Sequence, residues 1–130
     1  ANLVKAELNI LMGKYLEDES ATHDLIKYAE SYIEMEDKKL AKKISHTAVI
    51  ELFTDTTCFF CNGTGQVVFQ DSVDKCLHCH NGVFVWSDTS RSEIMGLKKG
   101  VYMKINKDYR ELITHLIDVE QSALAKLGDS

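Results

Sequence analysis

The sequence contains no proline, and its 130 residues include only 7 glycines. Sandwiches and barrels of β-strands need frequent turns, and turns draw heavily on these two residues. Their scarcity therefore favours a mainly helical protein. Hydrophobic residues make up 45% of the chain, which is too many for a disordered segment and suits one compact domain of this length.

Long hydrophobic runs are also missing. No stretch approaches the ~18 apolar residues of a membrane span, so we expect no membrane contact of that kind. No basic segment leads into an apolar run near Ala1, so we expect no secretory signal. The four cysteines are therefore expected in a reducing compartment, where metal binding is favoured over disulfides.

Positive charge is scarce overall, because 15 Lys and Arg face 20 Asp and Glu for a net charge of -5. The exception is the segment 88–110, which has a net charge of +3. The net negative charge of the whole chain argues against nonspecific nucleic-acid binding, whereas one basic segment is enough to contact phosphates.

The N-terminal part, residues 1–57, reads as helices. Apolar residues recur at three- and four-residue steps over 2–17, namely Val4, Leu8, Leu11, Met12 and Tyr15. Thr22 is the predicted N-cap of a second helix, which carries Leu25 and Ala29 on its apolar side. A third helix is predicted from Leu40 to about Thr54.

The middle part, residues 58–87, has the composition of strands. Residues 66–70 and 83–86 are rich in β-branched and aromatic side chains and are bounded by turn residues. We expect the two segments to pair as one hairpin, inserted into the helical domain like a zinc ribbon, with a cysteine pair at the base of each arm.

Helical periodicity returns in the last part, residues 88–130. Ser87 or Asp88 is expected to cap a helix that continues to about Lys98, and Gly100 is expected to break it. Asn106 is the predicted N-cap of a long last helix that ends at Gly128. Helix, break and basic second helix together predict a helix-turn-helix-like pair, which binds DNA in many proteins. The more usual alternative is a solvated basic face.

The strongest chemical signal is C-x2-C, fourteen residues, then C-x2-C. Two such knuckles facing each other close a tetrahedron around Zn²⁺, with Zn–S distances of ~2.3 Å. We predict a structural zinc ion on Cys58, Cys61, Cys76 and Cys79, because four thiolates leave no coordination position open. A redox pair, buried thiols, and replacement of one ligand by His78 or His80 are the alternatives.

Signatures of enzymes are missing. The sequence contains no phosphate-binding loop, no dinucleotide-binding glycine motif and no H-E-x-x-H zinc-protease motif. We therefore expect neither an enzyme nor a small-molecule substrate.

The order of these features resembles the lambda-type Q antitermination proteins of temperate phages. The resemblance rests on Cys58-Phe-Phe-Cys61-Asn-Gly63-Thr-Gly65, on Cys76-Leu-His-Cys79 and on the aromatic segment 83–87. The second knuckle departs from the family pattern, because its glycine is shifted by one position and a further glycine is missing. Similar knuckles occur in the cysteine-rich region of J-domain chaperones, which is the second-ranked resemblance.

The resemblance to Q proteins implies a regulator in the cytoplasm of a bacterial host cell. Such a protein binds double-stranded DNA at a phage late promoter and loads onto bacterial RNA polymerase, which then reads through terminators. The candidate phosphate contacts on this interpretation are Arg91, Lys98, Lys99, Lys104, Lys107 and Arg110, and the candidate base contacts are Ser90 and Asn106.

Two other classes of function stay open. A zinc-stapled protein-interaction module would use exposed Phe59, Phe60 and Trp86 and would not bind DNA. A metalloenzyme would need an open position on the zinc ion, which four thiolates do not leave.

Overall fold

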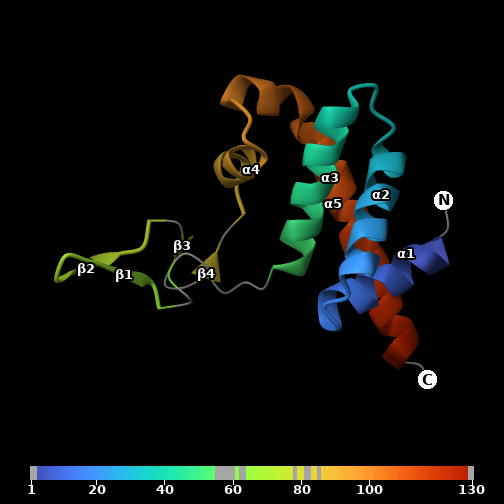
Figure 1. Ribbon diagram of the computed structural model, residues 1–130, viewed down its shortest axis with the longest axis horizontal. Coiled ribbons are helices and arrows are strands. Elements are labelled where there is room, and N and C mark those ends of the chain that lie inside the picture. Colours follow the sequence, from blue (N-terminus) through green and yellow to red (C-terminus); the bar gives the residue numbers. More distant parts are fainter. Residues whose placement is uncertain are drawn as a thin grey trace.

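The computed structural model describes residues 3–54, 61, 64–77, 79–80, 83–84 and 86–128, without the side chains of residues 69, 79, 80, 83 and 84. The described part is mainly helical, which confirms this part of the predicted fold class (Figure 1). Its helices are α1 (Leu3–Ile10), the π-helix η1 (Leu11–Tyr15), α2 (Glu19–Ile33), α3 (Lys38–Phe53), α4 (Asp88–Met95) and α5 (Lys99–Gly128). Among them, none has both the length and the hydrophobicity that crossing a membrane requires.

The helices pack into one body around the 30-residue helix α5. Helices α1, α2, α3 and α4 all contact α5. The largest fully buried side chains include Tyr102, Tyr109, Leu112 and Leu116, all from α5. The core is thus assembled around the C-terminal helix, which needs the N-terminal helices to cover it.

The predicted single hairpin is wrong. Strand β1 (Gln66–Phe69) pairs antiparallel with β2 (Ser72–Lys75), and β3 (Cys79–His80) pairs separately with β4 (Val83–Phe84). The reason lies at Gln70 and Asp71, which both have positive φ and connect β1 to β2 by a two-residue turn. Figure 1 shows the β1–β2 hairpin extending away from the helical body.

The start of α2 also differs from the prediction. Asp18, not Thr22, is the N-cap, because its carboxylate accepts the backbone N–H of Ala21 at 3.1 Å. The Thr22 hydroxyl instead donates to the Asp18 carbonyl at 3.0 Å. Asp37 caps α3 in the same way by accepting the Leu40 N–H at 3.1 Å.

The break between the last two helices lies earlier than predicted. Gly96 ends α4 in the left-handed conformation with φ 69°, and α5 begins at Lys99. Gly100 lies in the first turn of α5, and Asn106 lies within the helix rather than at its cap. Tyr102 and Ile105 are buried in the core, which explains the apolar character of the segment that the sequence analysis took for a loop.

Candidate nucleic-acid interface and cysteine cluster

Hydrogen bonds from neighbouring residues fix both ends of the short helix α4. Ser87 and Ser90 form a reciprocal capping box, in which the Ser87 hydroxyl accepts the Ser90 N–H at 3.2 Å and the Ser90 hydroxyl accepts the Ser87 N–H at 2.9 Å. At the other end, the N–H of Leu97 donates to the Ser92 carbonyl at 3.0 Å. Only residues 96–98 then separate α4 from α5.

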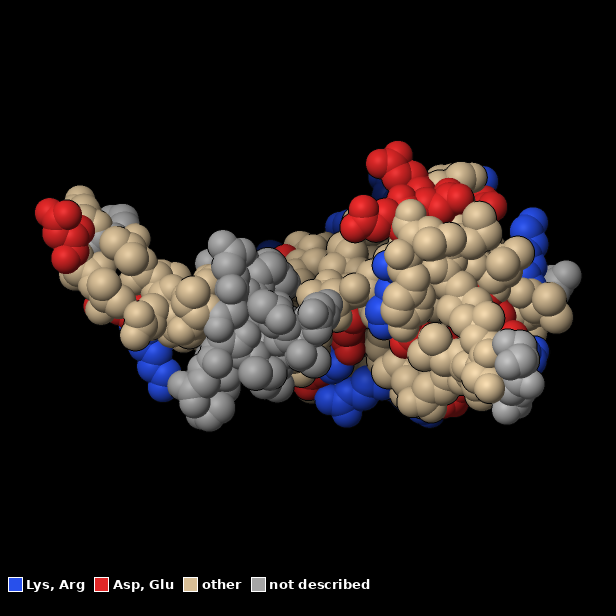
Figure 2. All heavy atoms as spheres, turned by 90° about the horizontal axis from the view of Figure 1, so that it is seen from below, with Lys and Arg blue, Asp and Glu red and all other residues tan. Residues whose placement is uncertain are grey.

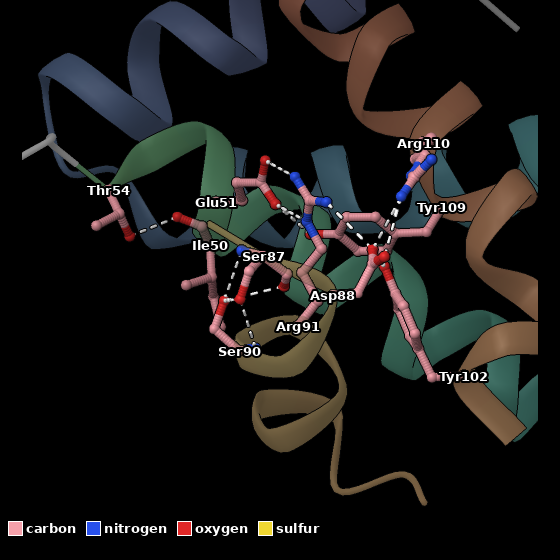
Figure 3. Close-up of polar contacts among 10 residues, drawn as sticks. All are labelled: Ile50, Glu51, Thr54, Ser87, Asp88, Ser90, Arg91, Tyr102, Tyr109 and Arg110. Carbon is pink, nitrogen blue, oxygen red and sulfur yellow. Dashed lines mark hydrogen bonds and ion pairs between the residues drawn. The ribbon is translucent and has the colours of Figure 1, made fainter. Parts of the chain in front are cut away.

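Arg91 joins α4 to α3. Its Nε and Nη2 atoms donate to the two carboxylate oxygens of Glu51 at 2.9 and 3.0 Å (Figure 3). The Tyr109 hydroxyl donates to Glu51 Oε1 at 2.8 Å, and the guanidinium lies 5.3 Å from the centre of the Tyr109 ring. The exposed fractions of the Arg91 and Glu51 side chains are 15% and 12%. Hydrogen bonds to Glu51 raise the pKa of Arg91, so the guanidinium stays charged.

Asp88 extends this network onto the first half of α5. Its carboxylate accepts the Tyr102 hydroxyl at 2.9 Å and Arg110 Nη2 at 3.0 and 3.2 Å (Figure 3). The Tyr102 hydrogen bond, followed by Arg110, lowers the pKa of Asp88. The two acidic residues therefore bind α4 to α3 and α5 and set the orientation of the two C-terminal helices.

This network changes the status of three predicted DNA contacts. Arg91 is engaged by Glu51, and the Ser90 hydroxyl is engaged in the capping box, so neither is carried into a DNA interface. Arg110 is shared with Asp88, although 57% of its side chain is exposed. Sequence reasoning did not identify Glu51 and Asp88 as their partners, because contacts between residues 40 and 22 positions apart leave no local pattern.

The other predicted contacts lie on or next to the first turns of α5. Lys98, Lys99, Lys104 and Lys107 are exposed. Within the described part of the chain, no ion pair joins any of these four lysines to an acidic residue. Asn106 is half-buried and lines a surface hollow of about 500 Å³ together with Lys107, Arg110 and His115.

The described part of the cysteine motif forms a small cluster apart from the main core. Cys61 and Cys76 are buried next to each other and pack against Trp86. The N–H of Gly65 points at Cys61 Sγ at 3.2 Å, and the Gly65 carbonyl accepts the N–H of Cys76 at 2.9 Å. Gly65 has φ 77°, a conformation that glycine adopts without a steric cost. One turn thus brings Cys61 and Cys76 together and places an amide at a sulfur atom.

The remaining predicted ligands lie outside what is described. Cys58 and His78 are not among the described residues, and the side chains of Cys79 and His80 are not described. In the part of the chain that is described, no group of three or more metal-binding side chains occurs. Only two of the four predicted cysteine ligands have described side chains, so this absence does not bear on the predicted zinc site.

Comparisons with models of protein families, with curated proteins and with solved structures each give no match for this chain.

Proposed function

We propose that this protein binds double-stranded DNA through α4, the turn 96–98 and α5. The observation that carries the proposal is the form of this unit: an eight-residue helix, a three-residue turn that starts with glycine in the left-handed conformation, and a second helix with lysines in its first turns. Helix-turn-helix units have this form and place the N-terminal part of the second helix against base edges and phosphates.

The proposed contacts are a subset of those predicted from the sequence. Lys98 and Lys99 flank the turn, and Lys104 and Lys107 follow at helical spacing on α5. Such lysines neutralise phosphates and position a protein on the duplex. The first backbone N–H groups of α5 add a favourable partial positive charge at the same end. Arg110 and the half-buried Asn106 lie at the edge of this set.

We further propose that Cys58, Cys61, Cys76 and Cys79 hold a structural zinc ion. Two buried thiols side by side, with an amide directed at one sulfur, fit the donor set of a zinc knuckle. The ion would cross-link the two cysteine pairs. Trp86 packs on the cysteine cluster and directly precedes the Ser87 cap of α4, so the cluster sets where the DNA-binding unit begins.

Within DNA-binding regulators, the class we propose is the transcription antiterminator. This part of the proposal rests on the resemblance of the cysteine knuckles and the C-terminal helices to lambda-type Q proteins. The partners are then a phage late promoter and bacterial RNA polymerase in the host cytoplasm. The acidic N-terminal helices are left free to contact protein.

The test is terminator read-through in a purified transcription assay with bacterial RNA polymerase. The template carries the late promoter that lies beside this protein's coding region. Read-through is expected with the zinc-loaded protein and is expected to disappear with Cys76→Ser. A folded, zinc-loaded protein that neither shifts this promoter fragment nor changes read-through would contradict the proposal.

A direct binding measurement separates DNA contact from antitermination. Lys107→Ala should weaken binding to the promoter duplex, because one phosphate contact is lost. For the same reason, the slope of a plot of log Kd against log salt concentration should fall by ~0.9. Lys39→Ala, which removes an exposed lysine from α3, is the matched control and should leave the slope unchanged. An equal effect of both variants would indicate nonspecific attraction.

The second candidate is a protein-interaction module. The β1–β2 hairpin exposes Val68 and Val73, which face each other across the two strands, and the following Leu77 is 92% exposed. Acidic atoms lie at the outer end of this hairpin, on the left in Figure 2, which makes it a poor surface for DNA. Zinc-dependent capture of a polypeptide without any DNA affinity would favour this alternative.

A further inference from the structure

Helix α1 and the following π-helical turn carry an exposed apolar stripe, whose last member, Tyr15, donates its hydroxyl to Glu120 of α5 at 3.0 Å. Val4, Leu8 and Tyr15 are 69%, 53% and 52% exposed, and Leu11 is half-buried between them. The side of α1 that packs against the body is a different one, formed by Ala6, Asn9 and Ile10. The amphipathic pattern of this segment therefore faces outward.

The spacing of the stripe is that of a coiled-coil seam. The four residues are separated by four, three and four positions, which is the alternation of a and d positions in a heptad, and Leu11 and Tyr15 lie in the wider turn of the π-helix η1. The spacing of four, three and four positions is the same when it is counted from either end of the segment. A second helix running the opposite way thus presents the same seam, with Val4 opposite Tyr15 and Leu8 opposite Leu11.

The charges beside the seam do not oppose that arrangement. Glu7 and Lys14 each precede a seam residue and lie on the same flank, and both are paired with residues of α5 in the same chain. Within one chain Glu7 accepts Lys126 at 2.8 Å and Lys14 pairs with Glu120 at 2.6 Å. The flank is therefore locally neutral, and the net charge of -5 does not oppose association there.

The exposed area is large enough for a weak, specific dimer. The exposed fractions of Leu3 and Leu16 at the two ends of the stripe are 52% and 73%. Together with the seam, these side chains expose on the order of 500 Å² per chain, so two copies would bury about 1,000 Å², the lower limit for a specific interface.

We infer that α1 and η1 form a homodimer interface, in which the Val4, Leu8, Leu11 and Tyr15 seams of two copies pair antiparallel about a two-fold axis. An isologous contact of this kind uses the same surface on both copies. The inference does not depend on DNA binding or on zinc, since no residue of the seam belongs to α4, α5 or the cysteine cluster.

The test is sedimentation equilibrium of the full zinc-loaded chain from low to high micromolar concentration. We expect a reversible approach to twice the 14.7 kDa of one chain. Leu8→Glu and Val4→Glu should each raise the dissociation constant by about tenfold or more, because each places a charge in the seam. Both residues are more than half exposed, so neither change should alter the helical circular dichroism, or the unfolding midpoint at concentrations where the original protein is monomeric.

Val68→Glu is the matched control, because it adds the same charge at an exposed apolar residue of the β1–β2 hairpin. A monomer at every concentration would overturn the inference. A dimer that Val68→Glu dissociates while Leu8→Glu leaves it intact would also overturn it and would place the interface on the hairpin.

The antiparallel arrangement has its own readout. A photo-crosslinking residue in place of Val4 should join, between chains, the tryptic peptide that begins at Tyr15. Val4 and Tyr15 of one chain are about 16 Å apart along the helix, which is too far for an adduct within the chain. An adduct between two N-terminal peptides would show parallel pairing and contradict this arrangement.

Discussion

At the residue scale, the molecule depends on a mostly buried ion pair that connects three helices. Glu51 of α3 accepts two hydrogen bonds from Arg91 of α4 and one from Tyr109 of α5. Burial and the nearby Glu51 carboxylate also raise the pKa of the Tyr109 hydroxyl, which therefore remains a donor throughout the physiological range. Arg91, one of the predicted DNA contacts, thus connects α4 to α3 within the molecule.

Removing the carboxylate should be costly. Glu51→Ala leaves the Arg91 charge and the Tyr109 hydroxyl without their acceptor, so we expect the free energy of unfolding to fall by about 2–4 kcal/mol. Denaturation in urea measures this loss. Glu111→Ala, at an exposed position on α5, is the control and should change stability by less than ~0.5 kcal/mol. Equal losses in the two variants would show that the network does not stabilise the fold.

At the element scale, the π-helical turn η1 depends on close packing at Gly13. A Cβ atom at this position would lie 2.7 Å from Thr22 Oγ1 and 3.0 Å from Phe53 Cζ. The missing side chain therefore lets η1 approach α2 and α3. Gly100, by contrast, lies in the first turn of α5, and a Cβ atom there would have no neighbour within 4 Å.

The two glycines give opposite predictions for the same substitution. Gly13→Ala should lower the free energy of unfolding by about 1–3 kcal/mol, because Phe53 and Thr22 must move. Gly100→Ala should leave stability unchanged or raise it by up to ~1 kcal/mol, since alanine has the higher helix propensity and fits. Thermal unfolding of both variants tests the pair. A stable Gly13→Ala variant would refute the close packing of η1.

The cysteine cluster and the helical core are separate elements. The main core contains side chains from the helices alone, whereas Cys61 and Cys76 form their own cluster with Trp86. Removal of the proposed zinc by a chelator should therefore leave most of the helical circular dichroism and a cooperative unfolding transition.

The fluorescence of Trp86 can show whether the cysteine cluster itself depends on the metal. This residue is the only tryptophan of the chain and lies on the cysteine cluster, so its fluorescence should change when the metal is removed and recover when Zn²⁺ is added back. Cys76→Ser should show the metal-free spectrum from the start. A fluorescence spectrum that is insensitive to both chelation and Cys76→Ser would contradict zinc binding at this cluster.

At the scale of the whole molecule, His115 connects the two halves of the chain. It lies on α5 and stacks on Tyr32 of α2, with ring centroids 4.0 Å apart and an interplanar angle of 4°. Its Nε2 lies 2.8 Å from the Tyr28 hydroxyl. Burial lowers the pKa of His115, opposed in part by the charge of Asp118.

This burial makes stability depend on pH in a defined direction. The pKa in the folded state lies below the unfolded value of ~6.5, so the unfolded state binds more protons in between. Stability should therefore be fully present above ~6.5 and fall as the pH drops towards the folded pKa. Urea denaturation at several pH values between about 7.5 and 5.5 measures the slope.

A histidine variant checks the origin of that slope. His115→Asn should remove most of the pH dependence, whereas His23→Asn, at an exposed position on α2, should retain it. If both variants keep the slope of the original protein, the pH dependence arises elsewhere.

The sequence by itself determined those features that depend on neighbouring residues. The absence of proline and the three- and four-residue periodicity predicted a mainly helical protein, and the repeated C-x2-C predicted the cysteine cluster, part of which the structure describes. The three- and four-residue spacing of Tyr109, Leu112, Leu116 and Val119 on the last helix also agrees with their burial.

Only the tertiary structure decided which surface each apolar or charged segment packs against. The break in the C-terminal part lies at Gly96 rather than Gly100, because Tyr102 and Ile105 are needed in the core. Arg91 is engaged by a carboxylate forty positions earlier, and the apolar stripe of α1 faces outward. Periodicity shows that a helix has an apolar side, but the energy of burial depends on which surfaces the rest of the chain brings to it.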